Sequence, residues 1–222
     1  MTLQQTRGRL RDILTILQET YPDAACALHF TTPLELLIAT ILSAQCTDAQ
    51  VNRVTPELFQ KYRTAAEYAT IAGDTLAADI RSTGFYRQKA RLIQRCCEAL
   101  VLHHNGRVPD TMEALIRLPG IGRKTANVVL GNAFHKTQGI AVDTHVQRLA
   151  QRLALTSATH PDTIEQDLLL LVPRKAWTLF SHLLISHGRT LCKARAPRCV
   201  ECPLHHFCNM AQPGSASEKR VS

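Results

Sequence analysis

Aromatic residues, long apolar runs and acidic charge are all scarce in this sequence of 222 residues. Aromatic side chains make up only 5% of the chain, and the alternating apolar and polar pattern of a half-buried strand is rare. The longest apolar run, residues 168–172, is far shorter than the roughly 20 residues of a membrane-spanning helix. Residues 1–11 are polar and basic, without the apolar stretch of a secretory signal. We therefore expect a globular protein of the cytoplasm, with no membrane partner.

The shortage of acidic residues leaves the chain strongly basic. Lysine and arginine number 26 against 18 aspartates and glutamates, which gives a formal net charge of +8 and a pI of about 9.3. A surplus of this size favours a polyanionic partner, most often a nucleic acid. Ribosomal proteins and ordinary basic enzymes share it, so charge alone does not decide between these classes.

Helical periodicity takes the place of the missing strand pattern. Leu10, Ile13, Leu14 and Leu17 form one apolar stripe, which predicts an amphipathic N-terminal helix. A second helix is predicted over residues 34–42, and a long one over residues 87–104 that ends at an Asn-Gly pair. Cap signals predict helix starts at Thr32-Pro33, Thr55-Pro56, Thr64 and Asp110. The predicted fold class is all-α.

Four of the eight cysteines fall close together near the C-terminus, in the spacing Cys-x6-Cys-x2-Cys-x5-Cys. They are Cys192, Cys199, Cys202 and Cys208. Without an export signal they are expected to be thiols, and four thiolates hold either a zinc ion or an iron–sulfur cluster. Structural zinc usually takes two closely spaced pairs and only one is present here, so the spacing favours a [4Fe-4S] cluster over zinc.

The loop between the first two of these cysteines is basic. It contains Lys193, Arg195 and Arg198, three positive charges within six residues, Lys193 to Arg198. Phosphate contacts of proteins come largely from such side chains. We expect the bound cluster to brace this loop against a phosphate backbone.

A glycine-containing turn lies between two predicted helices at residues 118–125. Pro119 ends the first helix, Gly120 and Gly122 are expected to allow conformations and close approaches that a Cβ would forbid, and Arg123 precedes the next helix. A tight turn that opens a helix presents free N–H groups at the positive end of the helix, which is a seat for phosphate. A Walker loop is excluded, because it requires glycine directly before the lysine. A plain helix–turn–helix corner is the structural alternative.

Two residues are candidates for catalysis. Lys124 lies in the first turn of the helix that follows this glycine-containing turn, where the helix dipole disfavours a cation by about 0.3–1 kcal/mol. A lysine placed where its neutral form is favoured is a candidate amine nucleophile. Asp143 precedes a helix predicted over residues 144–153 and is its expected N-cap. A fixed carboxylate there could also stabilise a cationic sugar or accept a proton from Lys124.

Three motifs in order, residues 118–126, residues 142–145 and the four-cysteine run, resemble the helix-hairpin-helix DNA glycosylases, most closely the endonuclease III family. The resemblance covers nearly the whole chain, including Leu42-Ser43-Ala44-Gln45. It implies a six-helix domain over residues 26–136 and an iron–sulfur domain formed by residues 1–25 with 137–210. Residues 211–222 are expected to form a disordered tail.

The resemblance also implies an activity in base excision repair. The family members are bifunctional DNA glycosylases and abasic-site lyases that remove oxidised pyrimidines from double-stranded DNA. Lys124 would form a Schiff base that leads to β-elimination, and Asp143 would be the essential carboxylate. Gln45 matches a position that fills the gap left by an extruded nucleotide, and Phe85 matches a wedge on the opposite strand. A polar surface residue and a core aromatic are the respective structural alternatives.

Other functions remain open at this point. An adenine-removing mismatch glycosylase would share the hairpin and the cluster but lack the lysine, and it would add a C-terminal domain that we do not expect here. Specificity for pyrimidine dimers or for mismatched uracil or thymine is a further possibility. A non-catalytic iron–sulfur DNA-binding protein would need neither Lys124 nor Asp143. We expect a monomer associated with the nucleoid.

Overall fold

The computed structural model describes residues 3–210, and this part of the chain contains α-helices and short 3-10 helices but no strand. The all-α prediction is confirmed. The chain divides into two compact units. We call Cys26–Gln138 the hairpin domain, and Met1–Ala25 with Gly139–Ser222 the cysteine domain. The tail predicted at 211–222 lies outside the described residues.

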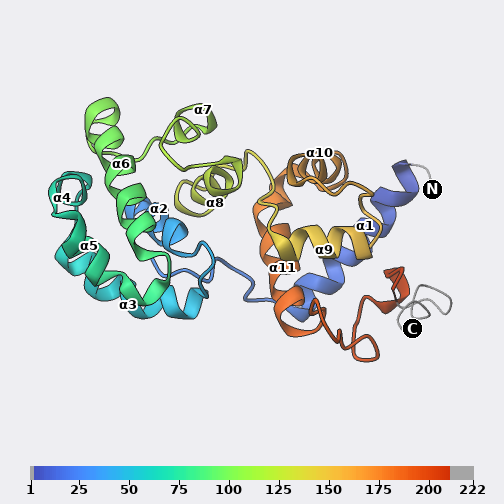
Figure 1. Ribbon diagram of the computed structural model, residues 1–222. Helices are drawn as coiled ribbons and strands as arrows, with labels where there is room; N and C mark the ends of the chain where they lie inside the picture. The colour runs from blue at the N-terminus through green and yellow to red at the C-terminus, as the bar shows by residue number, and fades with distance from the viewer. Residues whose placement is uncertain (1–2, 211–222) are drawn as a thin grey trace. The chain divides into compact units, whose positions relative to one another are not determined.

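The hairpin domain is built around α2, which is largely apolar and buried from Leu36 to Leu42 except at Thr40. Helix α2 packs against α3, α6 and α8, and α6 in turn packs against α4 and α5 (Figure 1). Apart from the single turn of α7, six α-helices make up the domain. The elements are α2 (Pro33–Leu42), α3 (Asp48–Lys61), α4 (Ala65–Thr70), α5 (Gly73–Asp79), η1 (Arg81–Thr83), α6 (Tyr86–His104), α7 (Met112–Leu115) and α8 (Arg123–Ala133).

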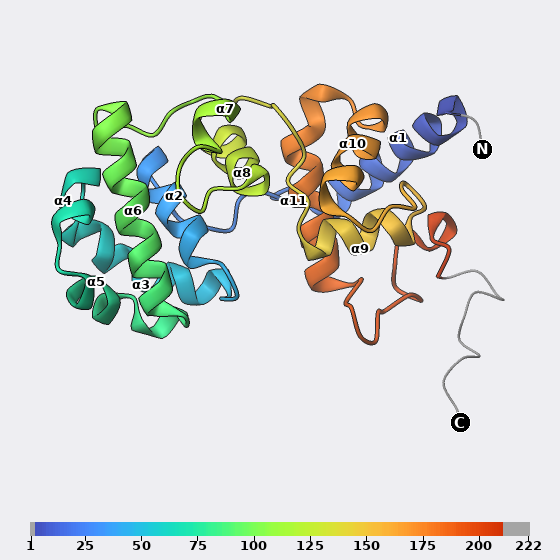
Figure 2. The ribbon, with the colours of Figure 1, turned by 45° about the horizontal axis from the view of Figure 1, so that its top comes forward.

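The cysteine domain joins the two ends of the described chain. Helix α1 packs against α10 and α11, so Leu10, Ile13 and Leu17 of the predicted N-terminal stripe are buried among helices from the second half of the sequence, and Leu14 is partly buried (Figure 2). Its elements are α1 (Leu3–Thr20), α9 (Thr144–Arg152), α10 (Pro161–Leu171), η2 (Arg174–Ala176), α11 (Trp177–Thr190) and η3 (His205–Phe207). Within residues 3–210, every helix is too short or too polar to cross a membrane.

Local cap signals fix several helix starts. Thr32 and Thr64 each accept a hydrogen bond from the backbone of a glutamate three residues later, and that glutamate caps in return. These two capping boxes confirm the predicted starts, and such a cap stabilises a helix by about 1 kcal/mol. The long helix α6 ends, as predicted, at Asn105 in a left-handed conformation followed by Gly106.

The predicted helix start at Thr55-Pro56 is wrong. Helix α3 already begins at Asp48, with Thr47 as its N-cap, and Pro56 lies inside it. The buried face of α3 continues through the proline, because Thr55 on one side of it and Leu58 on the other are both buried. Tertiary packing of this face therefore outweighs the hydrogen bond that a proline cannot donate.

The predicted start at Asp110 is wrong by one residue. Thr111 is the N-cap of α7, and its hydroxyl accepts from the Ala114 N–H. The carboxylate of Asp110 instead pairs with the ammonium group of Lys136, which lowers the pKa of Asp110. The ion pair ties the chain just before α7 to the segment that follows α8.

Candidate active site and cysteine cluster

The turn between α7 and α8 is tight, and one of its glycines is required by the fold. The N–H of Ile121 donates to the carbonyl of Leu118 at 3.1 Å, and Gly120 has a φ of +74°. A Cβ on Gly120 would lie 2.2 Å from Cδ1 of Leu92 in α6, so another residue would require Leu92 to move as well as an unfavourable left-handed backbone. This contact seats the turn directly on α6.

Gly122, the second glycine of the turn, is not required by the packing of the chain. Gly122 has a φ of −92°, and a Cβ there would meet no atom of the chain within 4 Å. The prediction that this glycine allows a conformation forbidden to other residues is therefore wrong, and no atom of the described chain approaches it closely. Gly122 is the exposed N-cap of α8 and supplies no side-chain cap, so the N-terminus of this helix stays open to an outside anion.

Lys124 lies in the first turn of α8, two residues after this glycine, and its side chain is exposed. The first turn of α8 contains no acidic residue. The neighbouring Arg123 is half-buried. The lysine amine therefore stands at the positive end of a helix dipole without a carboxylate in the same turn, as the sequence predicts.

Asp143 is the N-cap of α9, as predicted. Its Oδ1 accepts from the backbone N–H of His145 at 2.9 Å and of Val146 at 2.8 Å, and the residue is half-buried. These two bonds hold the carboxylate in one orientation. Lys124 belongs to the hairpin domain and Asp143 to the cysteine domain.

His145, the second residue of α9, is packed against Arg148 and α11. Burial lowers the pKa of His145, and the positive charge of Arg148 acts in the same direction, although Asp143 opposes it. Nη2 of Arg148 lies 3.1 Å from Nδ1 of His145 and also donates to the carbonyl of Gly188. A Cβ on Gly188 would lie 2.7 Å from Nδ1 of His145, so α11 packs closely on the start of α9.

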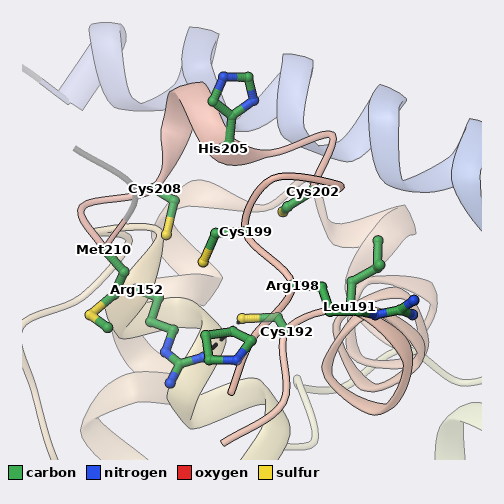
Figure 3. A pocket seen from close by; sticks show the side chains of 10 residues that line it. Arg152, Leu191, Cys192, Arg198, Cys199, Cys202, His205, Cys208 and Met210 are labelled. Atoms are coloured by element: carbon green, nitrogen blue, oxygen red, sulfur yellow. Dashed lines mark hydrogen bonds between the residues drawn. The ribbon is translucent and has the colours of Figure 1, made fainter. Parts of the chain in front are cut away.

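The four C-terminal cysteines line one pocket. Cys192 follows α11, Cys199 and Cys202 lie in the next loop, and Cys208 follows η3. Figure 3 shows their side chains gathered around a common space, with Leu191 and Met210 also in the lining. Within residues 3–210, no three His, Cys, Asp or Glu side chains are placed to hold a single metal ion. Four soft thiol donors around a pocket fit a multinuclear iron–sulfur cluster.

Arg152 in α9 is a residue of this site that the sequence did not indicate. Its Nη1 donates to Sγ of Cys192 at 3.1 Å and to the carbonyl of Lys193 at 2.9 Å, and its Nη2 donates to the carbonyl of Ala194 at 3.2 Å. The guanidinium thus holds a predicted cluster ligand and the start of the basic loop together. No spacing rule connects Arg152 with cysteines about 40 residues further along the chain.

The three cations of the basic loop differ in their surroundings. Arg198 forms an ion pair with Glu201 at 3.0 Å and donates to the carbonyl of Thr190 at 3.1 Å, so its guanidinium braces the loop. Lys193 and Arg195 are exposed. The loop therefore presents at least these two charges to solvent.

Gln45 and Phe85 come together in the hairpin domain. Gln45 lies in the turn after α2 and Phe85 precedes α6, and both line one pocket together with Lys89. Both residues adopt left-handed backbone conformations, with φ of 51° and 48°. Phe85 is 59% exposed, which excludes the alternative that it is a core aromatic.

Comparisons with known proteins agree with this arrangement. Residues 38–174 match the model of the HhH-GPD superfamily of base excision DNA repair proteins, and residues 192–208 match the iron-sulfur binding domain of endonuclease III. Endonuclease III of Synechocystis sp. is 52% identical over 206 residues, covering 93% of this chain and 94% of that protein.

Two solved structures have the same architecture. One is a non-covalent endonuclease III–DNA complex, and the other is a trapped endonuclease III–DNA covalent intermediate, described as an estranged-adenine complex. Each has a TM-score of 0.88 and 45% identity, and the match covers 95% of this chain and 97% of the solved one.

Proposed function

Because the chain belongs to the endonuclease III family within the HhH-GPD superfamily of base excision DNA repair proteins, we propose that it removes oxidised pyrimidines with Lys124 as the nucleophile. It is a DNA glycosylase and abasic-site lyase, and it carries an iron–sulfur cluster. The substrate is double-stranded DNA that contains a damaged base or an abasic site. The enzyme acts as a monomer at the nucleoid, in the cytoplasm.

The reaction begins with eversion of the damaged nucleotide, since Lys124 cannot reach a base inside the stack. The neutral amine attacks C1′ of the sugar, the bond from C1′ to the base nitrogen breaks, and the base leaves with a proton. Asp143 stabilises the positive charge that develops on the sugar. Opening of the sugar ring gives an imine between Nζ of Lys124 and C1′. Loss of a C2′ proton then expels the 3′ phosphate by cleavage of the C3′–O bond.

The observation that carries this proposal is the position of Lys124 at the open N-terminus of α8. The same helix end offers phosphate a set of backbone N–H groups and places the lysine amine directly beside them. An exposed lysine at this turn would also serve phosphate binding, so the enzyme assignment rests on the family membership together with the presence of both Lys124 and Asp143.

The remaining assignments concern the cluster, the basic loop and the pocket in the hairpin domain. Cys192, Cys199, Cys202 and Cys208 would hold the [4Fe-4S] cluster, which would link the end of α11, the following loop and the segment after η3. Lys193 and Arg195 contact the phosphate backbone, with Arg198 as their brace. Gln45 fills the gap left by the everted nucleotide, and Phe85 is the wedge on the opposite strand.

Borohydride trapping on a panel of duplexes tests the proposed function. The panel contains thymine glycol, an abasic site, a pyrimidine dimer, uracil or thymine opposite guanine, and adenine opposite 8-oxoguanine. We expect a reduced covalent complex and strand cleavage with thymine glycol and with the abasic site. Trapping only with a mismatch or only with a dimer would show that the enzyme is specific for that lesion and not for oxidised pyrimidines. Base release without any trapping would exclude the imine.

The two hairpin glycines should respond differently to alanine. Gly120→Ala should lower the free energy of unfolding by about 2–4 kcal/mol, because it combines a left-handed conformation with a clash on Leu92. Gly122→Ala should cost less than about 1 kcal/mol but weaken binding to an abasic-analogue duplex, since its methyl group covers the helix end. Urea unfolding and fluorescence anisotropy measure the two effects. Unchanged DNA affinity of Gly122→Ala would contradict phosphate binding at this turn.

Removal of one predicted ligand tests the cluster assignment. Cys199→Ala should lose bound iron and sulfide, together with affinity for DNA, because the basic loop loses its anchor. Cys46→Ala is the matched control, since Cys46 belongs to the hairpin domain and does not line this pocket. Iron and sulfide analysis of the purified proteins reports the result. A full iron content in Cys199→Ala would remove this residue from the ligand set.

A further inference from the structure

A buried lysine lies beneath the pocket that Gln45 and Phe85 share. Lys89 is only 4% exposed and lies on the face of α6 that also carries the buried residues Ala90 and Ile93. Its Nζ donates to the carbonyl oxygen of Leu42 at 2.7 Å and to that of Thr83 at 2.8 Å. Burial lowers the pKa of Lys89. Both acceptors are backbone groups, so the ammonium group joins two segments of main chain.

The two carbonyls end the elements that lead to Gln45 and Phe85. Leu42 is the last residue of α2, three residues before Gln45, and Thr83 is the last residue of η1, two residues before Phe85. Carbonyl groups at a helix C-terminus lack partners within the helix and carry partial negative charge, which suits a cation. Lys89 thereby fixes the distance between Leu42 and Thr83, the residues after which the two loops begin.

The loops themselves are strained and need such support. Gln45 and Phe85 both have positive φ values, a conformation that is unfavourable for a residue with a Cβ and persists only where the surroundings hold it. A second bridge lies nearby, since Nε2 of Gln50 donates to Oγ of Ser82 at 2.9 Å. The two chain segments that carry the exposed side chains of Gln45 and Phe85 are therefore joined by side-chain hydrogen bonds.

We propose that Lys89 is a positioning residue for lesion extrusion, and that it sets the spacing at which Gln45 and Phe85 enter the duplex. This inference rests on the proposed function, in which Gln45 and Phe85 replace stacking that the everted nucleotide loses. Two side chains held at a fixed spacing do not have to be ordered during binding, so less of the binding energy is lost when they insert.

Fold stability alone does not explain a lysine at this position. Burial of an ammonium group is costly, and the two acceptors of Lys89 are neutral carbonyl groups rather than a carboxylate whose charge would offset that cost. Methionine would fill nearly the same space and pack against the neighbouring Leu92 and Ile41 of the pocket. What methionine cannot do is join the two carbonyls.

The test compares Lys89→Met with the wild type on duplex and on single-stranded abasic DNA, in single-turnover cleavage with the cluster-loaded enzyme. Eversion is required only in the duplex. Lys89→Met should cleave the duplex about 10- to 100-fold more slowly and the single strand within about 2-fold of the wild-type rate. A duplex with 2-aminopurine opposite an abasic analogue should show a smaller rise in fluorescence with the variant. Lys61→Met, at an exposed lysine of the same domain, is the control.

A double-mutant cycle separates positioning from a general loss of structure. If Lys89 acts through the two inserted side chains, Lys89→Met should have little further effect on duplex cleavage when Gln45 and Phe85 are both alanine. If Lys89→Met does not fold, Lys89→Gln, which retains a donor, takes its place in the same cycle. Equal slowing on both substrates, or a full effect in the alanine background, would overturn the inference. Absence of trapping by the wild type would instead overturn the proposed function.

Discussion

Lys124→Gln is expected to abolish borohydride trapping and to slow strand cleavage by about 10³-fold or more. Loss of a covalent nucleophile removes the intermediate itself, and no group within the same turn of α8 offers a second amine. Binding to an abasic-analogue duplex should remain within a few-fold of wild type, since glutamine leaves the helix N-terminus open to phosphate. Gel analysis of trapped complexes and single-turnover cleavage measure the two effects.

A matched control accompanies this variant. Lys136→Gln changes another lysine of the hairpin domain, one that pairs with Asp110 rather than standing at a helix N-terminus. It should trap and cleave as the wild type does. Trapping that persists in Lys124→Gln at the wild-type yield would show that a different amine carries the reaction.

Asp143→Asn is expected to slow base release by about 10²- to 10³-fold while the fold is kept. Asparagine caps a helix about as well as aspartate, so the bonds to the N–H groups of His145 and Val146 can persist without the charge. The difference then reports the negative charge beside the cationic sugar. Single-turnover kinetics with thymine glycol, together with urea unfolding, separates the two properties.

Asp143→Ala completes the comparison, because it removes the cap as well as the charge. It should lower the free energy of unfolding by about 1 kcal/mol relative to Asp143→Asn, with a similar loss of activity. Wild-type rates in Asp143→Asn would mean that this residue only caps α9.

Much of the fold could be predicted because its signals are local. Thr32 and Thr64 each start a helix with a reciprocal glutamate cap, and the Asn105-Gly106 pair ends one. The failure at Pro56 has a tertiary cause, since burial of Thr55 and Leu58 continues α3 through a residue that usually begins a helix. A single sequence does not show which faces will be covered.

The residues of the candidate site also divide into those with a local sequence signal and those that only tertiary contacts reveal. The hairpin, Asp143 and the cysteine run can be read from residue type and spacing, whereas Arg152 and Lys89 become functional candidates only through contacts distant in sequence. The sequence does contain one indication of Lys89, since it places a lysine on the apolar face of a predicted helix. Gly122 is different, because no neighbouring atom of the chain requires a glycine at this position.

Peptide mapping of the borohydride-trapped complex identifies the amine that carries the reaction. The enzyme is incubated with an abasic duplex and borohydride, digested with protease and nuclease, and analysed by mass spectrometry. We expect a reduced deoxyribose adduct on Nζ of Lys124. An adduct on another lysine or on the N-terminal amine, with Lys124 unmodified, would contradict this expectation.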